Sequence, residues 1–290
     1  MSAIFGPAGT PEDFAEKGYK GSINVPEYIN EMGLDAFEYQ CGQGVRIKQE
    51  LATNLGKKAA DMGVKLSLHA PYFISLSSVE KEKRDNSINY ILQSARAVDW
   101  LGGTRIVIHS GSCSKMSREE ALVLAKETML RAREALISEG LSHIRCCPET
   151  MGKINQLGTL DEVLEICALD ESFIPCIDFG HLNARTFGNS NSPEAYEMIL
   201  NSIENKLGES RLREFHSHFS KIEYTENGGE KRHLTFEDTV YGPEYEPLME
   251  LVYKKNLSPT FICESAGTQG IDAKAMKNYY QGLKQKRGIV

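Results

Sequence analysis

Histidines and carboxylates fall at or near the ends of predicted strands in this 290-residue chain: His69, His109, Glu149, Asp178, His216 and Glu264. Imidazole nitrogens and carboxylate oxygens, with no thiolate among them, are ligands that suit zinc, manganese or iron. Each residue alone is more often a hydrogen-bonded core histidine or a helix cap. Buried together, however, they would be strongly unfavourable unless a cation offset their charge and polarity. The sequence therefore predicts a metal site.

Two further histidines extend the predicted cluster. Asp178 and His181 lie three residues apart at a predicted strand-to-helix turn, so both side chains can reach one site. A helix cap is the alternative role for His181. His233 follows Lys231 and Arg232 in a long polar segment, where a solvated loop residue is the alternative to a metal ligand.

Other residues with chemical potential are interpreted as structural. We expect His218 to face away from His216, and His143 to begin a strand. Cys146 and Cys147 are adjacent, so they form neither an ordinary disulfide nor a Cys-x-x-Cys metal knuckle. The chain also lacks a complete glycine-rich dinucleotide or phosphate-binding motif.

Short apolar runs predict the strands that must position the cluster: Ile4–Gly6, Ala36–Gln40, Lys65–His69, Arg105–His109, His143–Thr150, Ile174–Asp178, Glu214–Phe219 and Thr260–Glu264. Their nearly continuous apolar cores are typical of parallel strands that are covered on both faces. Helical patterns lie between them: Arg46–Met62, Glu80–Leu101, Ser117–Glu139, Thr159–Leu169, Pro193–Leu207, Pro243–Lys255 and Ile271–Lys286. A long polar loop is expected over Ser220–Gly242.

This alternation predicts an α/β protein, a single (β/α)8 TIM-barrel domain over residues 1–290. In such a barrel the C-terminal ends of the strands converge on one face, where enzymes of this fold carry their chemistry. The predicted ligands therefore belong to one metal site on that face.

Composition narrows the class of protein. Hydrophobic residues at 41% and charged residues at 25% indicate an ordinary globular chain, and no apolar run is long enough to cross a membrane. The start lacks the pattern of a signal peptide, and seven cysteines without paired spacing favour reduced thiols in the cytoplasm. A net charge of −7 argues against nucleic-acid binding when taken alone.

The motifs resemble those of the endonuclease IV family, the zinc-dependent apurinic/apyrimidinic endonucleases that form AP endonuclease family 2 on a xylose-isomerase-like TIM barrel. Leu68–Leu76 is similar to the family's His-x-x-Tyr-x-Ile-Asn-Leu segment, and Ile108–Ser112 to its His-Pro-Gly-Ser turn. Pro148–Gly152 resembles Glu-Asn-Thr-Ala-Gly, and Ile177–His181 resembles Asp-Thr-Cys-His.

The resemblance continues to the end of the predicted barrel. His216 with Ser220-Lys221 is similar to the family's His-x-x-Asp-Ser-Lys element. Glu264 stands where the last metal-binding glutamate is found. The similar segments keep their order from about residue 66 to residue 265, and so span most of the chain.

The resemblance implies a ligand set for each of up to three metal ions. His69, His109 and Glu149 would bind one ion. Glu149 would bridge to a second ion, held also by Asp178, His216 and Glu264, and is assigned the catalytic role. His181 and His233 would bind a third. Two metals that share a hydroxide can clamp both sides of a phosphodiester during in-line displacement.

One departure affects the third ion. The family's Asp-x-His is replaced here by Lys231-Arg232-His233, so that Glu230 would have to supply the carboxylate. The resemblance thus implies two or three zinc ions, with manganese an alternative at one site. Tyr72 would bind substrate by stacking or wedging at the damaged nucleotide, or would be a plain rim aromatic.

The resemblance implies an endonuclease that hydrolyses damaged double-stranded DNA on the 5′ side of an abasic site, acting as a cytoplasmic monomer without a membrane partner. Two or three divalent ions would change the charge of −7 to −3 or −1. Lys221, Lys231 and Arg232 are expected near the rim, so DNA is not excluded. The alternative is a metal-dependent sugar or sugar-phosphate isomerase or epimerase, which needs one metal on Glu149, Asp178, His216 and Glu264 but neither His69 nor His109.

Overall fold

Parallel strands close into a barrel in the computed structural model, which describes residues 2–287 and side chains as far as residue 285. The barrel strands are β1 (Ile4–Pro7), β2 (Ala36–Gln40), β3 (Lys65–His69), β4 (Arg105–Ile108), β5 (Arg145–Pro148), β6 (Cys176–Asp178), β7 (His216–Phe219) and β10 (Thr260–Cys263). They pair as two four-stranded sheets, β2-β3-β4-β5 and β1-β10-β7-β6. Parallel bridges between Ala8 and Glu38 and between Glu149 and Cys176 join the sheets. The predicted TIM barrel is confirmed.

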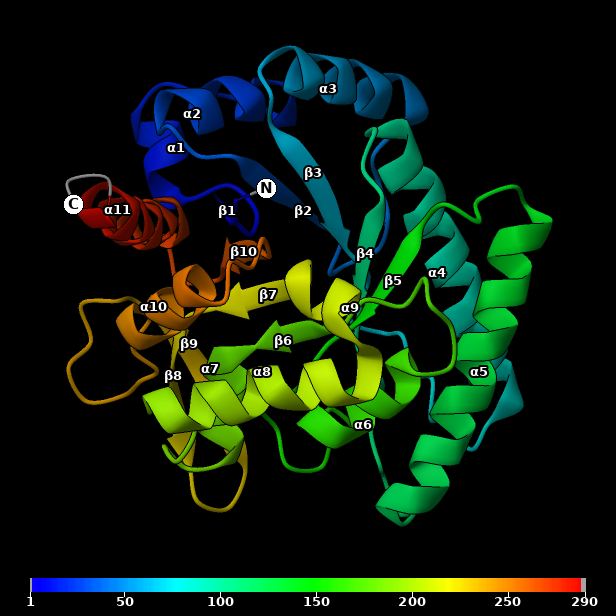
Figure 1. The fold of residues 1–290 in the computed structure, drawn as a ribbon. Coiled ribbons are helices and arrows are strands. Elements are labelled where there is room, and N and C mark those ends of the chain that lie inside the picture. Colours follow the sequence, from blue (N-terminus) through cyan, green and yellow to red (C-terminus); the bar gives the residue numbers. More distant parts are fainter. Residues whose placement is uncertain (1, 288–290) are drawn as a thin grey trace.

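Helices surround the strands (Figure 1). Their bounds are α1 (Glu12–Glu16), η1 (Ser22–Asn24), α2 (Val25–Glu31), α3 (Gln49–Asp61), α4 (Lys81–Trp100), α5 (Arg118–Ser138), α6 (Leu160–Cys167), α7 (Phe179–Arg185), α8 (Pro193–Leu207), α9 (Glu209–Arg213), α10 (Glu246–Lys254) and α11 (Gln269–Arg287). Among residues 2–287, none of these helices is both long and apolar enough to cross a membrane.

Local sequence explains where several helices begin. Ser117 and Glu120 form the predicted capping box at the start of α5, and Thr159 and Glu162 form a second one at α6. Ser192 caps α8, whose first turn contains a proline as predicted. These caps satisfy backbone N–H groups that have no partner inside the helix.

The structure differs from the sequence prediction between β7 and α10. The predicted loop over residues 220–242 contains an antiparallel hairpin, β8 (Lys221–Thr225) and β9 (Gly229–Leu234), with a register shift between Glu223 and Tyr224. Polar alternation on a surface hairpin lacks the apolar runs by which the buried strands were predicted. The hairpin has a functional consequence because it brings Glu230 and His233 over the barrel mouth.

Two arginines hold the loop between β5 and α6. Arg118 donates hydrogen bonds to the carbonyls of Ile154 and Gln156, both at 2.9 Å. Arg185 donates to the carbonyls of Met151 at 2.7 Å and Lys153 at 2.9 Å. These guanidinium groups satisfy carbonyls of the loop, so the loop is fixed in place above the barrel.

The buried Glu162 carboxylate anchors this arrangement. It accepts two hydrogen bonds from Arg118, both at 2.7 Å, and others from the backbone N–H groups of Gly158 at 2.8 Å and Thr159 at 2.9 Å. Burial opposes ionisation, but Arg118 and the two N–H groups outweigh it and lower the pKa of Glu162. The charged form therefore stabilises the folded chain.

We predict that Glu162→Gln lowers the free energy of unfolding by about 1–3 kcal/mol at neutral pH, because charge-assisted hydrogen bonds are lost. The pKa of Glu162 lies below its ordinary 4.5 in the folded state, so its contribution is complete above that value and disappears as the pH falls through the folded-state pKa. Urea unfolding should show the difference from wild type narrowing below about pH 4.5. Glu165→Gln, on the same helix but half-exposed, is the control. An unchanged difference at acid pH would contradict the assignment.

Candidate metal centre

The C-terminal ends of the barrel strands surround a cavity of about 340 Å³. Its lining includes most of the predicted site residues together with the β5–α6 loop and the β8–β9 hairpin: His69, Tyr72, His109, Glu149, Met151, Lys153, Gln156, His181, Glu230, His233 and Glu264. Asp178 and His218 lie behind this lining and are fully buried. Side chains far apart in the sequence therefore meet at one polar cavity.

Glu149 is the point where the first ligand group converges. It follows β5 directly and is 1% exposed. Its Oε2 atom lies 3.4 Å from His69 Nε2, at the end of β3, and 3.0 Å from His109 Nε2, just after β4. Its other oxygen, Oε1, is 2.9 Å from His218 Nδ1. Both carboxylate oxygens thus face imidazole nitrogens.

A second group shares Glu149. Donor atoms of Glu149, Asp178, His218 and Glu264 all lie within 4.8 Å of one another. His218 Nδ1 is 3.5 Å from Glu264 Oε1. Asp178 ends β6, which lies on the other side of β7 from the strand that precedes Glu264. Three carboxylates and one imidazole offer hard oxygen and nitrogen donors, a set that suits a divalent first-row cation.

A third group forms above the barrel, where the hairpin meets α7. His181, Glu230 and His233 place donor atoms within 4.8 Å of one another. His181 Nε2 lies 3.4 Å from Glu230 Oε2, and Gly152 packs against both residues. A Cβ atom at Gly152 would lie 2.6 Å from the Cβ of Glu230, so only glycine permits this approach. Glu230 therefore supplies the carboxylate of this group, in place of the family's aspartate, whose position is taken by Lys231.

Backbone carbonyls set the protonation of two of these rings. The Nδ1 atom of His69 lies 2.8 Å from the carbonyl of Ala70, and that of His181 lies 2.9 Å from the carbonyl of Thr150. A carbonyl oxygen only accepts hydrogen bonds, so each Nδ1 carries the proton. Each Nε2 lone pair is then directed into the cavity. This is how proteins commonly orient metal-ligating histidines.

Unpartnered oxygens show that the site suits a cation. Glu149 Oε2 and Asp178 Oδ2 are buried, yet neither accepts a hydrogen bond. The short approaches of His69 and His109 to Glu149 are therefore not aligned hydrogen bonds. Buried carboxylate oxygens without partners are strongly unfavourable unless a cation binds them. The residues present fit a bound metal.

The pKa values of the metal-free centre point the same way. Burial, reinforced by the carboxylates of Glu149 and Asp178, raises the pKa of Glu264 to about 7 despite His218. Burial opposes the charge of His181, but Asp178 and Glu230 raise its pKa to about 9. Protons thus offset the crowded negative charge, and a metal cation would displace them.

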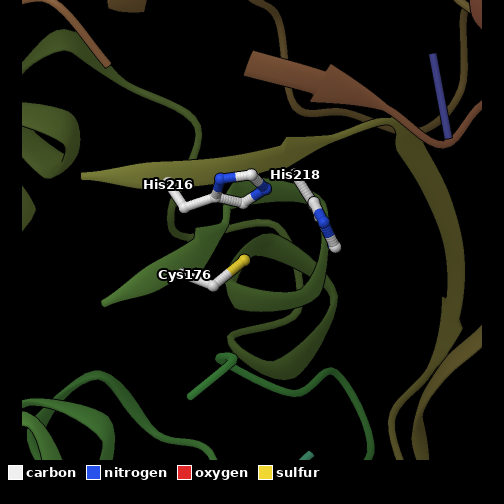
Figure 2. Close-up of side chains that lie close together, drawn as sticks. All are labelled: Cys176, His216 and His218. Atoms are coloured by element: carbon white, nitrogen blue, oxygen red, sulfur yellow. The ribbon is translucent and has the colours of Figure 1, made fainter. Parts of the chain in front are cut away.

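The structure corrects the expectation for β7. His216 and His218 do not face opposite directions: their rings are 5.6 Å apart, and Figure 2 shows both beside Cys176 of β6. Residues two apart in a strand share a face. His218 lies closer to the C-terminal end and contacts Glu149, whereas His216 begins the strand and contacts Glu38.

Two residues were not foreseen as parts of the site. Glu38, in the middle of β2, is fully buried and contacts both His216 and His218. The signal was a carboxylate inside the apolar run Ala36–Gln40, which is unfavourable to bury without a partner. His218 was recognisable from strand periodicity. His143, predicted to be structural, is exposed and pairs with Asp99 at 2.8 Å.

Tyr72 stands at the rim. Its ring is 55% exposed and stacks on His109 with ring centroids 5.4 Å apart and an interplanar angle of 28°. A Cβ atom at Gly42 would lie 2.4 Å from the Tyr72 ring, so this glycine makes room for it. An exposed aromatic face next to the ligands is suited to stacking against a planar or apolar part of a substrate.

We predict that Glu149→Ala removes metal from two of the three groups, because this residue belongs to both the first and the second group described above. Elemental analysis after zinc loading should find up to two fewer ions per chain than in wild type. Each independent site filled by zinc at about 100 times its Kd should also raise the wild-type free energy of unfolding by about 2.7 kcal/mol. His143→Ala is the matched control. Full metal retention by Glu149→Ala would refute the shared-ligand assignment.

Curated relatives cover most of the chain. An uncharacterized protein of Methanocaldococcus jannaschii, MJ0133, is 34% identical over 262 residues, which is 90% of this chain and 91% of the relative. A protein named "Probable endonuclease 4" of Ureaplasma urealyticum is 25% identical over 206 residues, 68% of this chain and 66% of that protein.

Solved structures share the fold at low identity. Endonuclease IV from Thermus thermophilus has a TM-score of 0.66 and 17% identity, covering 96% of this chain and 99% of its own. A D-tagatose 3-epimerase-like protein has a TM-score of 0.71 and 17% identity, covering 98% and 99%. A family model described as xylose isomerase-like TIM barrel matches residues 26–285. The chain belongs to the xylose isomerase-like TIM barrel family and is similar within it to proteins named endonuclease 4, which confirms the relationship that its motifs predicted.

Proposed function

We propose that this protein is a zinc-dependent phosphodiesterase of the apurinic/apyrimidinic endonuclease type, which cleaves damaged double-stranded DNA 5′ to an abasic site. The observation that carries the proposal is the presence of three ligand groups around one cavity, two of which share both Glu149 and His218. Clustered divalent cations are typical of enzymes that hydrolyse phosphodiesters. Manganese is the alternative to zinc at one group.

Some residues of the chain would hold the cations, and others orient the ligands. When bound, the cations supply Lewis acidity toward the phosphoryl oxygens. Glu149 holds the first two groups at a fixed separation through its two oxygens, and is the residue we assign to catalysis. His69 and His181 present fixed Nε2 lone pairs because Ala70 and Thr150 bind their opposite nitrogens. This preorganisation is what hydrolysis of a highly charged substrate requires.

The positively charged side chain at the cavity is not one of those that the sequence predicted. Lys221 is buried and pairs with Glu244 at 2.8 Å, and Arg232 pairs with Glu223 at 2.6 Å. Lys231 contacts the same Glu223. Lys153, on the clamped β5–α6 loop, lines the cavity and is exposed. We assign Lys153 to the substrate phosphate, because an ammonium group beside the ligands attracts an anionic ester.

A sugar epimerase is the second candidate, because Glu149, Asp178, His218 and Glu264 would by themselves suffice for a one-metal enzyme of that type. The shared fold does not separate these functions. His69, His109 and the group above the barrel favour the nuclease, since a one-metal sugar enzyme has no need of them. The buried, unpaired cysteines support a cytoplasmic location, and we expect a monomer.

The first test is incision of an end-labelled duplex that contains one abasic analogue. The zinc-loaded protein should cut 5′ to the analogue, leave an undamaged duplex intact, and lose activity after chelation. The salt dependence of incision should be shallow, because counterion release scales with the number of phosphate contacts and an acidic protein makes few of them. No incision at any metal loading, together with epimerisation of a ketose, would establish the second candidate instead.

Tyr72 provides a test of substrate contact that is separate from metal binding. We predict that Tyr72→Ala raises KM for the abasic duplex by about 5- to 150-fold, the equivalent of about 1–3 kcal/mol of base stacking. Tyr72→Phe keeps the aromatic face and should retain most of the affinity. Metal content should be unchanged in both variants. Equal losses in the two variants would show that the hydroxyl, not the ring, makes the contact.

A further inference from the structure

A carboxylate that belongs to none of the three ligand groups lies beneath them. Glu38 comes from the middle of β2 and is fully buried. Its Oε2 atom accepts hydrogen bonds from Ser67 Oγ and His216 Nε2, both at 2.9 Å. Its Oε1 atom lies 2.8 Å from His218 Nε2, although the N–H direction there is bent away from that oxygen. Glu38 thus joins His216 to His218.

His218 faces the metal centre with the opposite ring nitrogen from His69 and His181. His69 and His181 give Nδ1 to a backbone carbonyl and turn Nε2 toward the cavity. His218 turns Nδ1 toward Glu149 and donates to its Oε1 atom at 2.9 Å, a proton that a bound cation would displace. An imidazole can bind a cation through Nδ1 as a neutral ligand only when its proton is on Nε2. A group that favours a proton on Nε2 is therefore required.

Glu38 is the oxygen acceptor beside that nitrogen. Cys176 also lies against His218, and Figure 2 shows the thiol pointing toward the two histidines. Together with these rings it resembles a small metal site. His216 Nε2, however, already has an aligned partner in Glu38, and burial keeps the thiol protonated by raising its pKa. The cluster is better explained as a support for His218.

We propose that Glu38 is a positioning residue that holds His218 with its proton on Nε2 and its Nδ1 lone pair toward the cation. His216 and Ser67 fix the carboxylate from below, so that its second oxygen stays beside His218. The inference rests on the metal centre of the proposed function, since without a cation the orientation of His218 has no chemical use. Carboxylates that orient metal-ligating histidines in this way contribute substantially to metal affinity.

The test compares Glu38→Gln with wild type in zinc competition against a chromophoric chelator. The variant should bind zinc about 10- to 100-fold more weakly, the range observed when such supporting partners are lost. Asp272→Asn is the matched control, because it also neutralises a buried carboxylate but contacts Phe236 and Thr268 instead of the ligands. It should lose stability without losing zinc affinity.

Long-range 1H–15N NMR of the zinc-loaded protein provides a second measurement that does not depend on folding of a variant. Wild-type His218 should show a protonated Nε2 and a metal-bound Nδ1, whereas His69 and His181 show the reverse. Ser67→Ala, a milder change, should weaken zinc binding less than Glu38→Gln.

The outcomes separate the two proposals. A wild-type protein that binds no zinc overturns the proposed function. A wild-type protein that binds zinc, with Glu38→Gln binding equally well or His218 ligating through Nε2, overturns the role of Glu38 alone.

Discussion

The Glu149 carboxylate is almost wholly removed from water, and this constraint governs the arrangement around it. Removal of an ionised carboxylate from water is strongly unfavourable unless polar neighbours replace the lost hydration. His69 and His109 approach one of its oxygens and His218 the other. The His69 ring is in turn oriented by the carbonyl of Ala70, directly after β3. The strand ends are therefore positioned by the electrostatics of this side chain as well as by apolar packing.

Sequence patterns predicted the barrel well because its strands are apolar runs that end in a polar residue. His69 and Asp178 close their strands as predicted, and both lie at the cavity or directly behind it. His216 and His218 were wrongly expected to face opposite ways; residues two apart in a strand share a face, so only depth within the barrel separates them. Glu230 was named as the substitute carboxylate only through the resemblance, and Glu38 was not predicted. Their partners lie across the barrel or across a hairpin, and local sequence does not say which residues pair over such distances.

The family places this chain beside enzymes with different reactions on one scaffold, so the scaffold by itself says little about the substrate. In this chain two segments project over the barrel mouth. The β8–β9 hairpin brings Glu230 and His233 to His181, while the clamped β5–α6 loop brings Lys153. Both segments meet where Gly152 packs against Glu230. The positions of both segments thus depend on a few backbone contacts.

The barrel is assembled from two sheets that meet at two seams, one beside Glu38 and one beside Glu149. His69, His109 and Glu149 come from the β2–β5 side, whereas Asp178, His218 and Glu264 come from the other. A cation bound by ligands from both sheets would link the two halves of the barrel at the seam between them. Binding or loss of the metal would then change the stability of the contact between the two sheets. The metal centre would thus contribute to the stability of the fold as well as to its chemistry.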